Sequence, residues 1–352
     1  MKTSLLDYDL PPDLIADRPP PTRDGGRMLC LNEREVVHGE VRDFASHLRE
    51  HDLLVINETK VRKARLLCHR PHLSPGAGGG KVELLFLHEV EPQVWAALGK
   101  ANRPLRPGDQ LFAVDLKLKV ERRDDDGTLA IRVEGDLDGA LLAGGSMPIP
   151  PYMDRASDAD DDERYQTVFA QALGSAAAPT AGLHLTERML DEAKARGVRL
   201  SKVVLHVGVG TFRPVSTDDL DQHLMHSEQV CVSSSTCQAV LETRRAGGRV
   251  VAVGTTVVRA LESARDPACE GLVLPSELST RLLIQPGYRF SVVDALLTNF
   301  HQPKSTLLAL VSAFAGYERV FAAYREAVAH RYRFLSYGDA MWIPSCYARK
   351  TS

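Results

Sequence analysis

The sequence predicts an α/β main domain, a mixed sheet or open barrel with helices, that is interrupted by an inserted all-β, barrel-like domain. Strand and helix patterns alternate at the start of the 352-residue chain and again through its second half. Between these parts only strand patterns occur, and stretches rich in Pro, Gly and Ser flank this block at residues 71–80 and 144–151. We therefore expect the α/β domain at residues 1–70 and 151–352 and the β-domain at residues 71–150.

The first elements of the main domain follow a Pro-rich opening. The apolar pattern predicts a helix near residues 41–49 and a strand at residues 52–56. Alternation in the inserted block predicts strands within residues 81–90, 93–101, 110–123 and 128–135. The sequence Asp125-Asp126-Gly127 is typical of a hairpin turn. The block therefore has the strand content of a small barrel or sandwich.

After the inserted block the alternation of helices and strands returns. Thr186 can cap a helix that runs to Arg196, and Gly197 can end it. Met189, Leu190 and Ala193 share one face of this helix, and residues 198–207 then predict a strand.

Composition places the chain among globular proteins, because 44% of its residues are hydrophobic and its formal net charge is only −3. The sequence contains no apolar run of membrane-spanning length, and its first residues lack the apolar core of a signal peptide. We therefore expect a cytoplasmic protein without membrane contacts. The six cysteines form no CxxC pair and are expected to be free thiols. Basic residues gather at 244–259 and 325–333; such a face can bind a phosphate backbone or be ordinary solvated charge.

Two Gly/His-rich segments are the first candidates for a functional site. APTAGLHLT contains Gly182 and His184, and LHVGVGTFRPV contains His206, Gly208 and Gly210. Glycine lets a ligand approach the backbone closely, and histidine titrates near neutral pH. Both segments lie where strands, helices and loops meet, which is where α/β folds place their ligands. We expect N–H groups, hydroxyls and imidazoles to converge there on one ligand.

A second candidate begins at a strand predicted for residues 249–253. This strand runs into Gly254-Thr255-Thr256 and a helix, so free N–H groups and the positive end of the helix dipole face the turn. Arg259 lies one turn further on. The arrangement indicates an anion site, although such residues also cap many helices. The chain has no GxxxxGK[ST] and no GxGxxG that opens a helix, which argues against nucleotide hydrolysis and dinucleotide binding.

Asn299 and His301 form a third candidate. They precede a helix predicted at residues 307–314, which Ser305 can cap and which is expected to be buried because it is apolar nearly all round. Polar side chains at the edge of a buried helix indicate a functional site; the alternative is a histidine that satisfies loop carbonyls.

Two further patterns have several interpretations. The segment RFLSYGDAM contains Tyr337 and Asp339, and its rings can stack on a base or pack in the core. His223 and His226 have a spacing that could suit a metal, but HExxH and cysteine pairs are absent, so we expect hydrogen-bonded histidines and no metal site. The absence of GxSxG argues against a serine hydrolase.

Together these segments resemble a known family. ERYQTVFA at residues 163–170, HLMHSE at 223–228, AVGTTVVRALE at 252–262 and TNFHQPKSTLL at 298–308 join the segments above. Their order is that of the S-adenosylmethionine:tRNA ribosyltransferase-isomerase family of queuosine biosynthesis. The opening YDLPPDLIADRP and VINETKVRKARL at residues 55–66 agree with the same pattern. The resemblance therefore spans nearly the whole chain.

The resemblance implies a tRNA-modifying transferase. The ribosyl part of S-adenosylmethionine would be transferred to 7-aminomethyl-7-deazaguanine (preQ1) at the wobble position of a tRNA with a GUN anticodon. It would be isomerised to give epoxyqueuosine, with release of adenine and methionine. S-adenosylmethionine is then the co-substrate, no metal takes part, and a monomer is expected. The family's α/β domain with an inserted β-barrel agrees with the fold predicted above.

The matching motifs also imply roles. The positive sulfonium acidifies the neighbouring C5′ hydrogens, so a base can start the rearrangement, and the departing adenine takes up a proton. The catalytic candidates, among which the sequence does not rank the histidines, are His184, His206 and His301, with Glu228 and Asp339 orienting an imidazole or facing the sulfonium.

Binding roles follow in the same way. The implied cofactor-binding residues are Thr180, Gly182, Gly208, Gly210, Thr211, Thr255, Thr256, Arg259 and Asn299. Among them Thr255, Thr256 and Arg259 would meet either the carboxylate of methionine or a tRNA phosphate. The implied nucleic-acid contacts are Arg155, Arg164, Tyr165 and Tyr337.

Two other functions are compatible with parts of the sequence. A tRNA-binding protein without catalysis would use the Gly/His loops to hold a flipped-out base and would not bind S-adenosylmethionine. A methyltransferase would release S-adenosylhomocysteine, but the glycine-rich strand–turn–helix usual early in such sheets is not apparent. The inserted domain could grip tRNA, close over the cofactor or brace the main domain.

Overall fold

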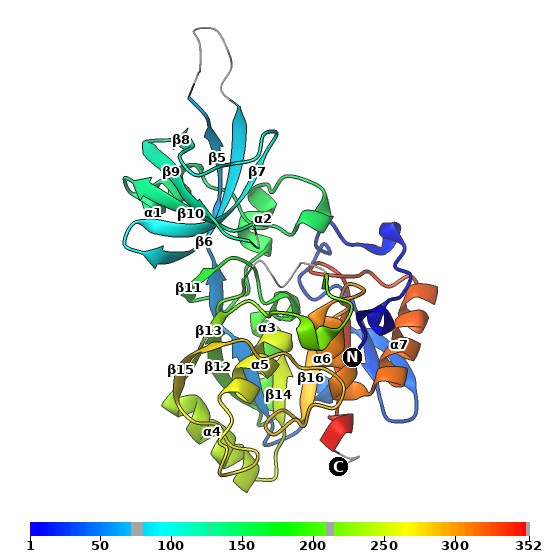
Figure 1. Cartoon of the computed structure of the whole chain (residues 1–352). Helices are drawn as coiled ribbons and strands as arrows, with labels where there is room; N and C mark the ends of the chain where they lie inside the picture. The colour runs from blue at the N-terminus through cyan, green and yellow to red at the C-terminus, as the bar shows by residue number, and fades with distance from the viewer. Residues whose placement is uncertain (72–79, 126, 209–214, 350–352) are drawn as a thin grey trace.

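The computed structural model describes residues 1–71, 80–125, 127–208 and 215–349. Figure 1 shows two units, a barrel built from one stretch of chain and a larger main domain that contains the first and last described residues. The barrel follows strand β4 (Thr59–Val61), and the chain re-enters the main domain at the 3-10 helix η4 (Pro151–Met153). The predicted α/β domain with an all-β insertion is confirmed.

The main domain is built on a mixed sheet of nine strands in the order β15-β13-β12-β3-β14-β16-β17-β1-β2. The central neighbours β12, β3, β14 and β16 run parallel. The edge strands β13, β15 and β2 pair antiparallel with their neighbours. The bounds are β1 (Arg27–Leu31), β2 (Val36–Glu40), β3 (Leu53–Asn57), β12 (Arg199–Leu205), β13 (Glu228–Val232), β14 (Val250–Val253), β15 (Ser276–Thr280), β16 (Ala295–Asn299) and β17 (Ala340–Ile343).

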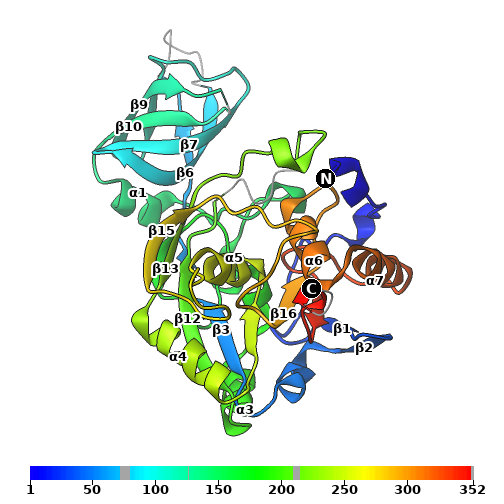
Figure 2. The same ribbon diagram turned by 60° about the horizontal axis from the view of Figure 1, so that its bottom comes forward.

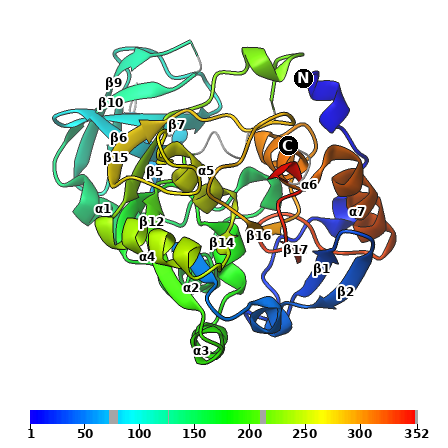
Figure 3. The same cartoon turned by 90° about the horizontal axis from the view of Figure 1, so that it is seen from below.

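Helices cover both faces of this sheet because its central strands are apolar on both sides. Leu53 and Val55 of β3 pack in one cluster with the helices α5, α6 and α7, whereas Leu54 and Ile56 face α3 and the 3-10 helix η3. Figure 3 shows α5 and α6 on one side of the sheet and α3 on the other. The bounds are η3 (Val41–His47), α3 (Glu187–Ala195), α4 (Ser234–Arg245), α5 (Thr255–Ser263), α6 (Thr306–Ala315) and α7 (Tyr317–Ala329).

Local signals begin and end the helices much as predicted. Thr186 caps α3 by accepting a hydrogen bond from the Met189 N–H at 3.2 Å, and Gly197 follows α3 with φ of 81°. Ser305 caps the buried helix α6 in the same way through the Leu308 N–H. The helix predicted near residues 41–49 is instead the shorter 3-10 helix η3, which ends because the backbone of Leu48 is extended.

The inserted domain is a closed barrel with the strand order β10-β7-β6-β5-β8-β9 and its own apolar core. The boundary expected at residue 71 lies inside this barrel, because β5 pairs with β6. The Pro/Gly-rich stretch therefore connects two neighbouring barrel strands, and composition alone does not distinguish this connection from a linker between domains. The bounds are β5 (Arg65–His69), β6 (Lys81–Glu91), β7 (Val94–Ala101), β8 (Gln110–Ala113), β9 (Leu116–Arg123), β10 (Leu129–Glu134) and α1 (Leu137–Gly144).

The two ends of the barrel meet at one place. Arg65 and Ser146 exchange backbone hydrogen bonds of 2.8 and 3.3 Å, so the chain leaves and re-enters the main domain at adjacent points. Figure 2 shows the barrel standing at one end of the main domain.

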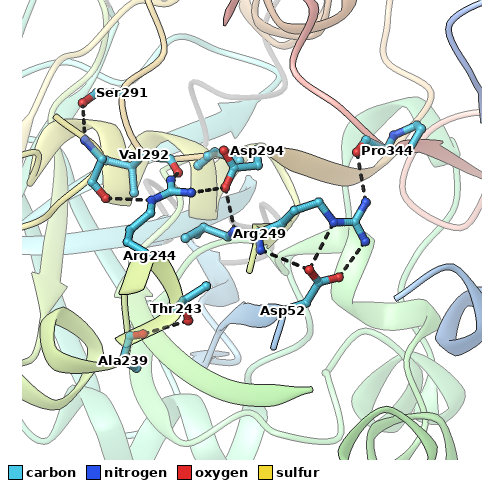
Figure 4. Close-up of polar contacts among 12 residues, drawn as sticks. Asp52, Ala239, Thr243, Arg244, Arg249, Ser291, Val292, Asp294 and Pro344 are labelled. Atoms are coloured by element: carbon cyan, nitrogen blue, oxygen red, sulfur yellow. Dashed lines mark hydrogen bonds and ion pairs between the residues drawn. The ribbon is translucent and has the colours of Figure 1, made fainter. Parts of the chain in front are cut away.

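Arginine–aspartate pairs tie the amino ends of the central strands together (Figure 4). Asp52 precedes β3 and is 1% exposed; its carboxylate accepts hydrogen bonds from the backbone and guanidinium of Arg249, which precedes β14. Asp294 precedes β16 and accepts from Arg244 at 2.5 Å and from the Val250 N–H at 2.7 Å. The side chains at the amino ends of these strands are therefore occupied by structural ion pairs. A ligand site is expected at the carboxyl ends of the strands instead.

The six cysteines are free, as predicted. Within the ranges described above, no single helix is long and apolar enough to cross a membrane; α6 and α7, bent by 114° at their junction, pass that test only as a pair. The remaining short elements are η1 (Thr3–Leu6), η2 (Pro12–Leu14), α2 (Ala159–Arg164), β11 (Ala172–Ser175), η5 (Thr180–His184), η7 (Leu220–Gln222) and η8 (Tyr347–Arg349).

Candidate active site

The candidate site lies at the carboxyl ends of β14 and β16, the edge of a parallel sheet that α/β proteins use for ligands. Two small cavities of about 30 Å³ each meet there, and both are lined by Thr180, Asn299, His301 and Leu307. One of them is also lined by the predicted Gly254-Thr255-Thr256 turn. Segments that are far apart in the sequence therefore converge at this edge.

A chain of hydrogen bonds runs from His184 to the cavities. The Asn299 amide Nδ2 donates to His184 Nε2 at 3.2 Å, and the Asn299 Oδ1 accepts from the Thr180 hydroxyl at 2.9 Å. Because the amide nitrogen can only donate, Nε2 of His184 carries a lone pair. Burial, with smaller contributions from Arg23 and Arg333, lowers the pKa of His184 to about 4. His184 is thus neutral at pH 7 and orients Asn299.

His301 is the histidine that faces the cavities. Its Nε2 lies 2.9 Å from the Thr298 hydroxyl, and its backbone N–H donates to the Tyr324 hydroxyl at 2.9 Å. Burial lowers the pKa of His301 to about 3, so this ring is also neutral at pH 7.

The lowered pKa values make the fold sensitive to acid. The pKa values of His184 (about 4) and His301 (about 3) lie below the 6.5 of an exposed histidine, so the unfolded chain binds more protons below pH 6.5. The stability they contribute is present above pH 6.5 and is lost as the pH falls towards 4. We expect the two rings to lower the free energy of unfolding by on the order of a few kcal/mol between pH 7 and pH 4.

Urea unfolding at pH 7, 5.5 and 4 measures this loss, with a His301→Gln variant as the comparison. The variant lacks one titrating ring and should lose less stability on acidification than the unmodified protein. Equal losses in the two proteins would contradict the expectation.

His206 lies away from the cavities. Its Nδ1 is 2.8 Å from the Thr59 hydroxyl, and its half-buried ring packs against Gly174, where an added Cβ would lie 2.9 Å from the ring. Burial lowers the pKa of His206. Because side chains alternate along an extended strand, Val207 lines a cavity while His206 points towards β4 and β11. Of the three candidate histidines, His301 therefore lines the cavities and His184 bonds Asn299 in their wall. His206 lines neither cavity.

Glu228 and Arg259 form a buried ion pair, each about 4% exposed. Glu228 also accepts a hydrogen bond from the Gly208 N–H at 3.1 Å, and Arg259 donates to the Leu282 carbonyl at 3.1 Å. The pair therefore fixes the start of the LHVGVGTFRPV segment, because the Glu228 carboxylate binds the backbone N–H of Gly208. The guanidinium expected to meet an anion is directed at Glu228, and its Nη2 has no hydrogen-bond partner within the part of the chain that the structure describes.

The glycines of the predicted site have different surroundings. A Cβ on Gly182 would lie 2.9 Å from the ring of Phe169, so this glycine is required by packing. At Gly208, none of the described residues has an atom within 4 Å of an added Cβ. Gly210 and Thr211 lie outside the described residues. Thr256 accepts a hydrogen bond from the Asn57 amide at 3.3 Å, and both threonines of the turn remain in the cavity wall.

Asp339 organises the loop next to His184. Its Oδ1 accepts from the Arg27 N–H and its Oδ2 from the Arg333 N–H, both at 2.8 Å, and the Arg27 guanidinium adds an ion pair at 3.2 Å. A Cβ added to Gly26 would lie 3.4 Å from Oδ1 of Asp339 and 3.7 Å from the His184 ring. Asp339 is therefore near His184, but the hydrogen bonds of its carboxylate go to backbone and arginine groups.

Three of the four residues expected to contact tRNA take part in one internal network. Arg155 bonds Asp161 through both terminal nitrogens at 2.6 and 2.7 Å, and the Tyr337 hydroxyl donates to the same carboxylate at 2.9 Å. Tyr165 is 0% exposed and packs edge-to-face on Tyr337. Stacking of either ring on a base is therefore incompatible with its position in the core. Arg164 bonds the Pro20 carbonyl, which fixes the Pro-rich opening.

A cleft of about 810 Å³ separates the barrel from the main domain. On the barrel side it is lined by Arg65, Glu83 and the exposed Lys100, and on the main-domain side by residues 148–151 and 154–157. Arg65 bonds Glu83 at 2.5 Å and the Ile149 carbonyl at 3.1 Å, so it links the two walls.

Comparison with known proteins then places the chain. A family model described as queuosine biosynthesis protein matches residues 3–343. The chain belongs to this family. Relatives from Sorangium cellulosum (47% identical, 97% of this chain and 98% of theirs) and Anaeromyxobacter dehalogenans (48%, 97% and 99%) are both named S-adenosylmethionine:tRNA ribosyltransferase-isomerase. The crystal structure of S-adenosylmethionine tRNA ribosyltransferase from Thermotoga maritima is 35% identical, with a TM-score of 0.54 over 97% of this chain and 100% of that one.

Two residues that line a cavity in this queuosine biosynthesis protein were not predicted from the sequence as site residues. Tyr152 and Ser336 line one cavity, and their hydroxyls bond each other. The Ser336 N–H also donates to the Tyr152 hydroxyl at 3.1 Å. Both residues stand in motifs that are visible in the sequence, PIPPYM and RFLSYGDAM, but only the fold shows that these motifs meet at the cavity.

Proposed function

We propose that the chain is an S-adenosylmethionine:tRNA ribosyltransferase-isomerase. It transfers the ribosyl moiety of S-adenosylmethionine to preQ1 at the wobble position of a tRNA with a GUN anticodon and isomerises it to give epoxyqueuosine, releasing adenine and methionine. The observation that carries this proposal is the convergence of Thr180, Asn299, His301 and the Thr255-Thr256 turn on adjoining cavities, in a chain 47% identical to an enzyme named for the reaction. The proposed reaction uses no metal.

The electrostatics of the site suit a cationic co-substrate. The rings of His184 and His301 are neutral at pH 7, because burial lowers their pKa values, so neither repels the positive sulfonium. A neutral imidazole also has the lone pair that a base needs. The sulfonium makes the C5′ hydrogens acidic, which reduces the basicity required of the ring.

We assign the proton transfer at C5′ to His301, because this residue lines both cavities. His184 lines neither of them, and it acts through the Asn299 amide, which fixes the Thr180 hydroxyl. His184 is therefore a positioning residue. The N–H groups and hydroxyls at the start of α5 would receive the methionine carboxylate. Ala181 and Val207, which precede Gly182 and Gly208, line the same cavity.

The tRNA is proposed to lie along the cleft between the barrel and the main domain, which gives the barrel a gripping role. Lys100 is exposed in the wall of this cleft and is suited to a phosphate contact. A Lys100→Ala variant is expected to bind tRNA more weakly and to lower the slope of log K against log salt by about 1. Its affinity for S-adenosylmethionine should not change.

Filter binding or fluorescence anisotropy over a range of salt concentrations measures this effect. Lys119→Ala is the matched control, because Lys119 is also exposed, on barrel strand β9, but does not line the cleft. Equal tRNA affinity and salt slope in both variants would exclude this path for the tRNA.

The function itself is tested by incubating the protein with S-adenosylmethionine and tRNA that carries preQ1. Chromatography detects released adenine, and mass analysis of the nucleosides detects the added sugar. Adenine together with a matching mass gain establishes ribosyl transfer. S-adenosylhomocysteine would instead show methyl transfer, and tRNA binding without affinity for S-adenosylmethionine would show a non-catalytic binding protein.

A further inference from the structure

Two histidines and a glutamate meet on the outer edge of the main domain, and none of the three lines the cavities described above. His38 lies on the edge strand β2, and Glu326 and His330 lie on the last turn of α7 and just after it. Figures 2 and 3 show β2 and α7 at the same side of the molecule. His38 Nε2 lies 3.4 Å and His330 Nδ1 3.2 Å from the same carboxylate oxygen of Glu326.

These distances suit a metal ion. A tetrahedral Zn²⁺ with bonds of about 2.0–2.1 Å holds its ligand atoms about 3.3 Å apart. The separations of 3.4 and 3.2 Å from Glu326 match that spacing before any ion is bound, and each of the three residues has a ligand atom within 4.8 Å of the others. Two imidazoles, one carboxylate and water are a common ligand set for zinc.

A buried tyrosine orients His38 for this role. The Tyr332 hydroxyl lies 2.7 Å from His38 Nδ1, and Tyr332 is 1% exposed. The guanidinium of Arg27 lies 4.2 Å from the centre of the Tyr332 ring and helps to hold it. In the tautomer that donates Nδ1–H to this hydroxyl, Nε2 presents its lone pair towards Glu326. Histidines that bind metals are oriented in this way by a partner on the second nitrogen.

The helix supplies the other two ligands in a favourable arrangement. Glu326 and His330 are four residues apart, which places both side chains on one face of α7. His330 Nδ1 is also 3.1 Å from the Glu326 carbonyl oxygen, so an ion would replace this contact. The carboxyl end of a helix carries partial negative charge, which favours a cation at this position.

We propose that His38, Glu326 and His330 form a surface site for Zn²⁺ or a similar divalent transition metal. The bound ion connects the edge strand β2, which pairs with β1, to the end of α7. It therefore stabilises this edge of the folded protein and takes no part in the ribosyl transfer.

Calorimetric titration with ZnCl₂ tests the site in the full-length protein, with thermal unfolding measured in parallel with and without zinc. One equivalent should bind to the unmodified protein and raise its melting temperature. His38→Ala and His330→Ala should each weaken binding by at least about tenfold and remove the thermal shift. His51→Ala is the control, because His51 is an exposed histidine beside Glu50 that belongs to no such cluster among the described residues, and it should bind zinc normally. Equal zinc affinity in the unmodified protein and the His38→Ala/His330→Ala double variant, or no binding by the unmodified protein, would overturn the proposal.

Discussion

Replacing His301 by Gln is expected to lower kcat for ribosyl transfer by roughly 10²–10⁴-fold, the range that a positioned general base contributes. Gln keeps a polar atom that can bond the Thr298 hydroxyl, which lies 2.9 Å from the histidine, so the fold should persist. The affinity for S-adenosylmethionine should change little, because the loss lies in proton transfer. Single-turnover release of adenine measures the rate, and circular dichroism checks the fold. A variant that retains near-normal kcat would show that His301 is not the base.

The same experiment separates His184 from His301. His184→Ala should also abolish most of the turnover, because Asn299 loses the partner that fixes its amide. If His184 acts only through Asn299, then His184→Ala should cost much less in an Asn299→Ala background than alone. His301→Gln should instead keep most of its effect in that background. Full additivity of His184→Ala and Asn299→Ala would assign His184 a direct role.

Replacing Asp52 by Ala is expected to lower the free energy of unfolding by about 3–5 kcal/mol, the usual cost of removing one partner from a buried ion pair. Asp52 is 1% exposed and accepts from Arg249 at 2.6 Å and from the Arg49 N–H at 2.8 Å. Its loss leaves a largely buried guanidinium and two backbone donors without this carboxylate. Urea unfolding followed by circular dichroism measures the change.

An exposed ion pair provides the control for Asp52. Asp191 and Lys194 lie 2.8 Å apart on α3, with side chains 72% and 56% exposed. Asp191→Ala should change the free energy of unfolding by less than about 1 kcal/mol. A similar small change for Asp52→Ala would mean that the pair at the amino ends of the strands contributes little to the fold.

Much of the fold was predictable because its signals are local. The cap at Thr186 and the glycine at 197 fix α3 by bonds within a few residues, and the apolar surface of α6 shows that this helix is buried. The barrel boundary was not predictable, because the Pro/Gly-rich stretch has the same composition whether it joins domains or strands. Only the pairing of β5 with β6 distinguishes the two cases.

The candidate site was predictable as a set of segments but not in its geometry. The sequence places His206 beside Val207 at the end of a strand, and alternation puts one of them on each face; which face holds the ligand depends on distant strands. Tyr165 and Tyr337 fit a stacking role by residue type. Only the fold shows that Tyr337 donates to Asp161, which lies 176 residues earlier in the chain, and that Tyr165 packs on Tyr337.

The meeting of the barrel's two ends at Arg65 and Ser146 also bears on the order in which the protein folds. Strands β3 and β12 are parallel neighbours, although roughly 140 residues separate them along the chain. Once the barrel has formed, its ends are adjacent, and the loop that must close to pair these strands shortens to roughly 60 residues. The entropy cost of closure falls by about 0.7 kcal/mol. A barrel that folds before the main domain therefore lowers the entropy cost of assembling the central sheet.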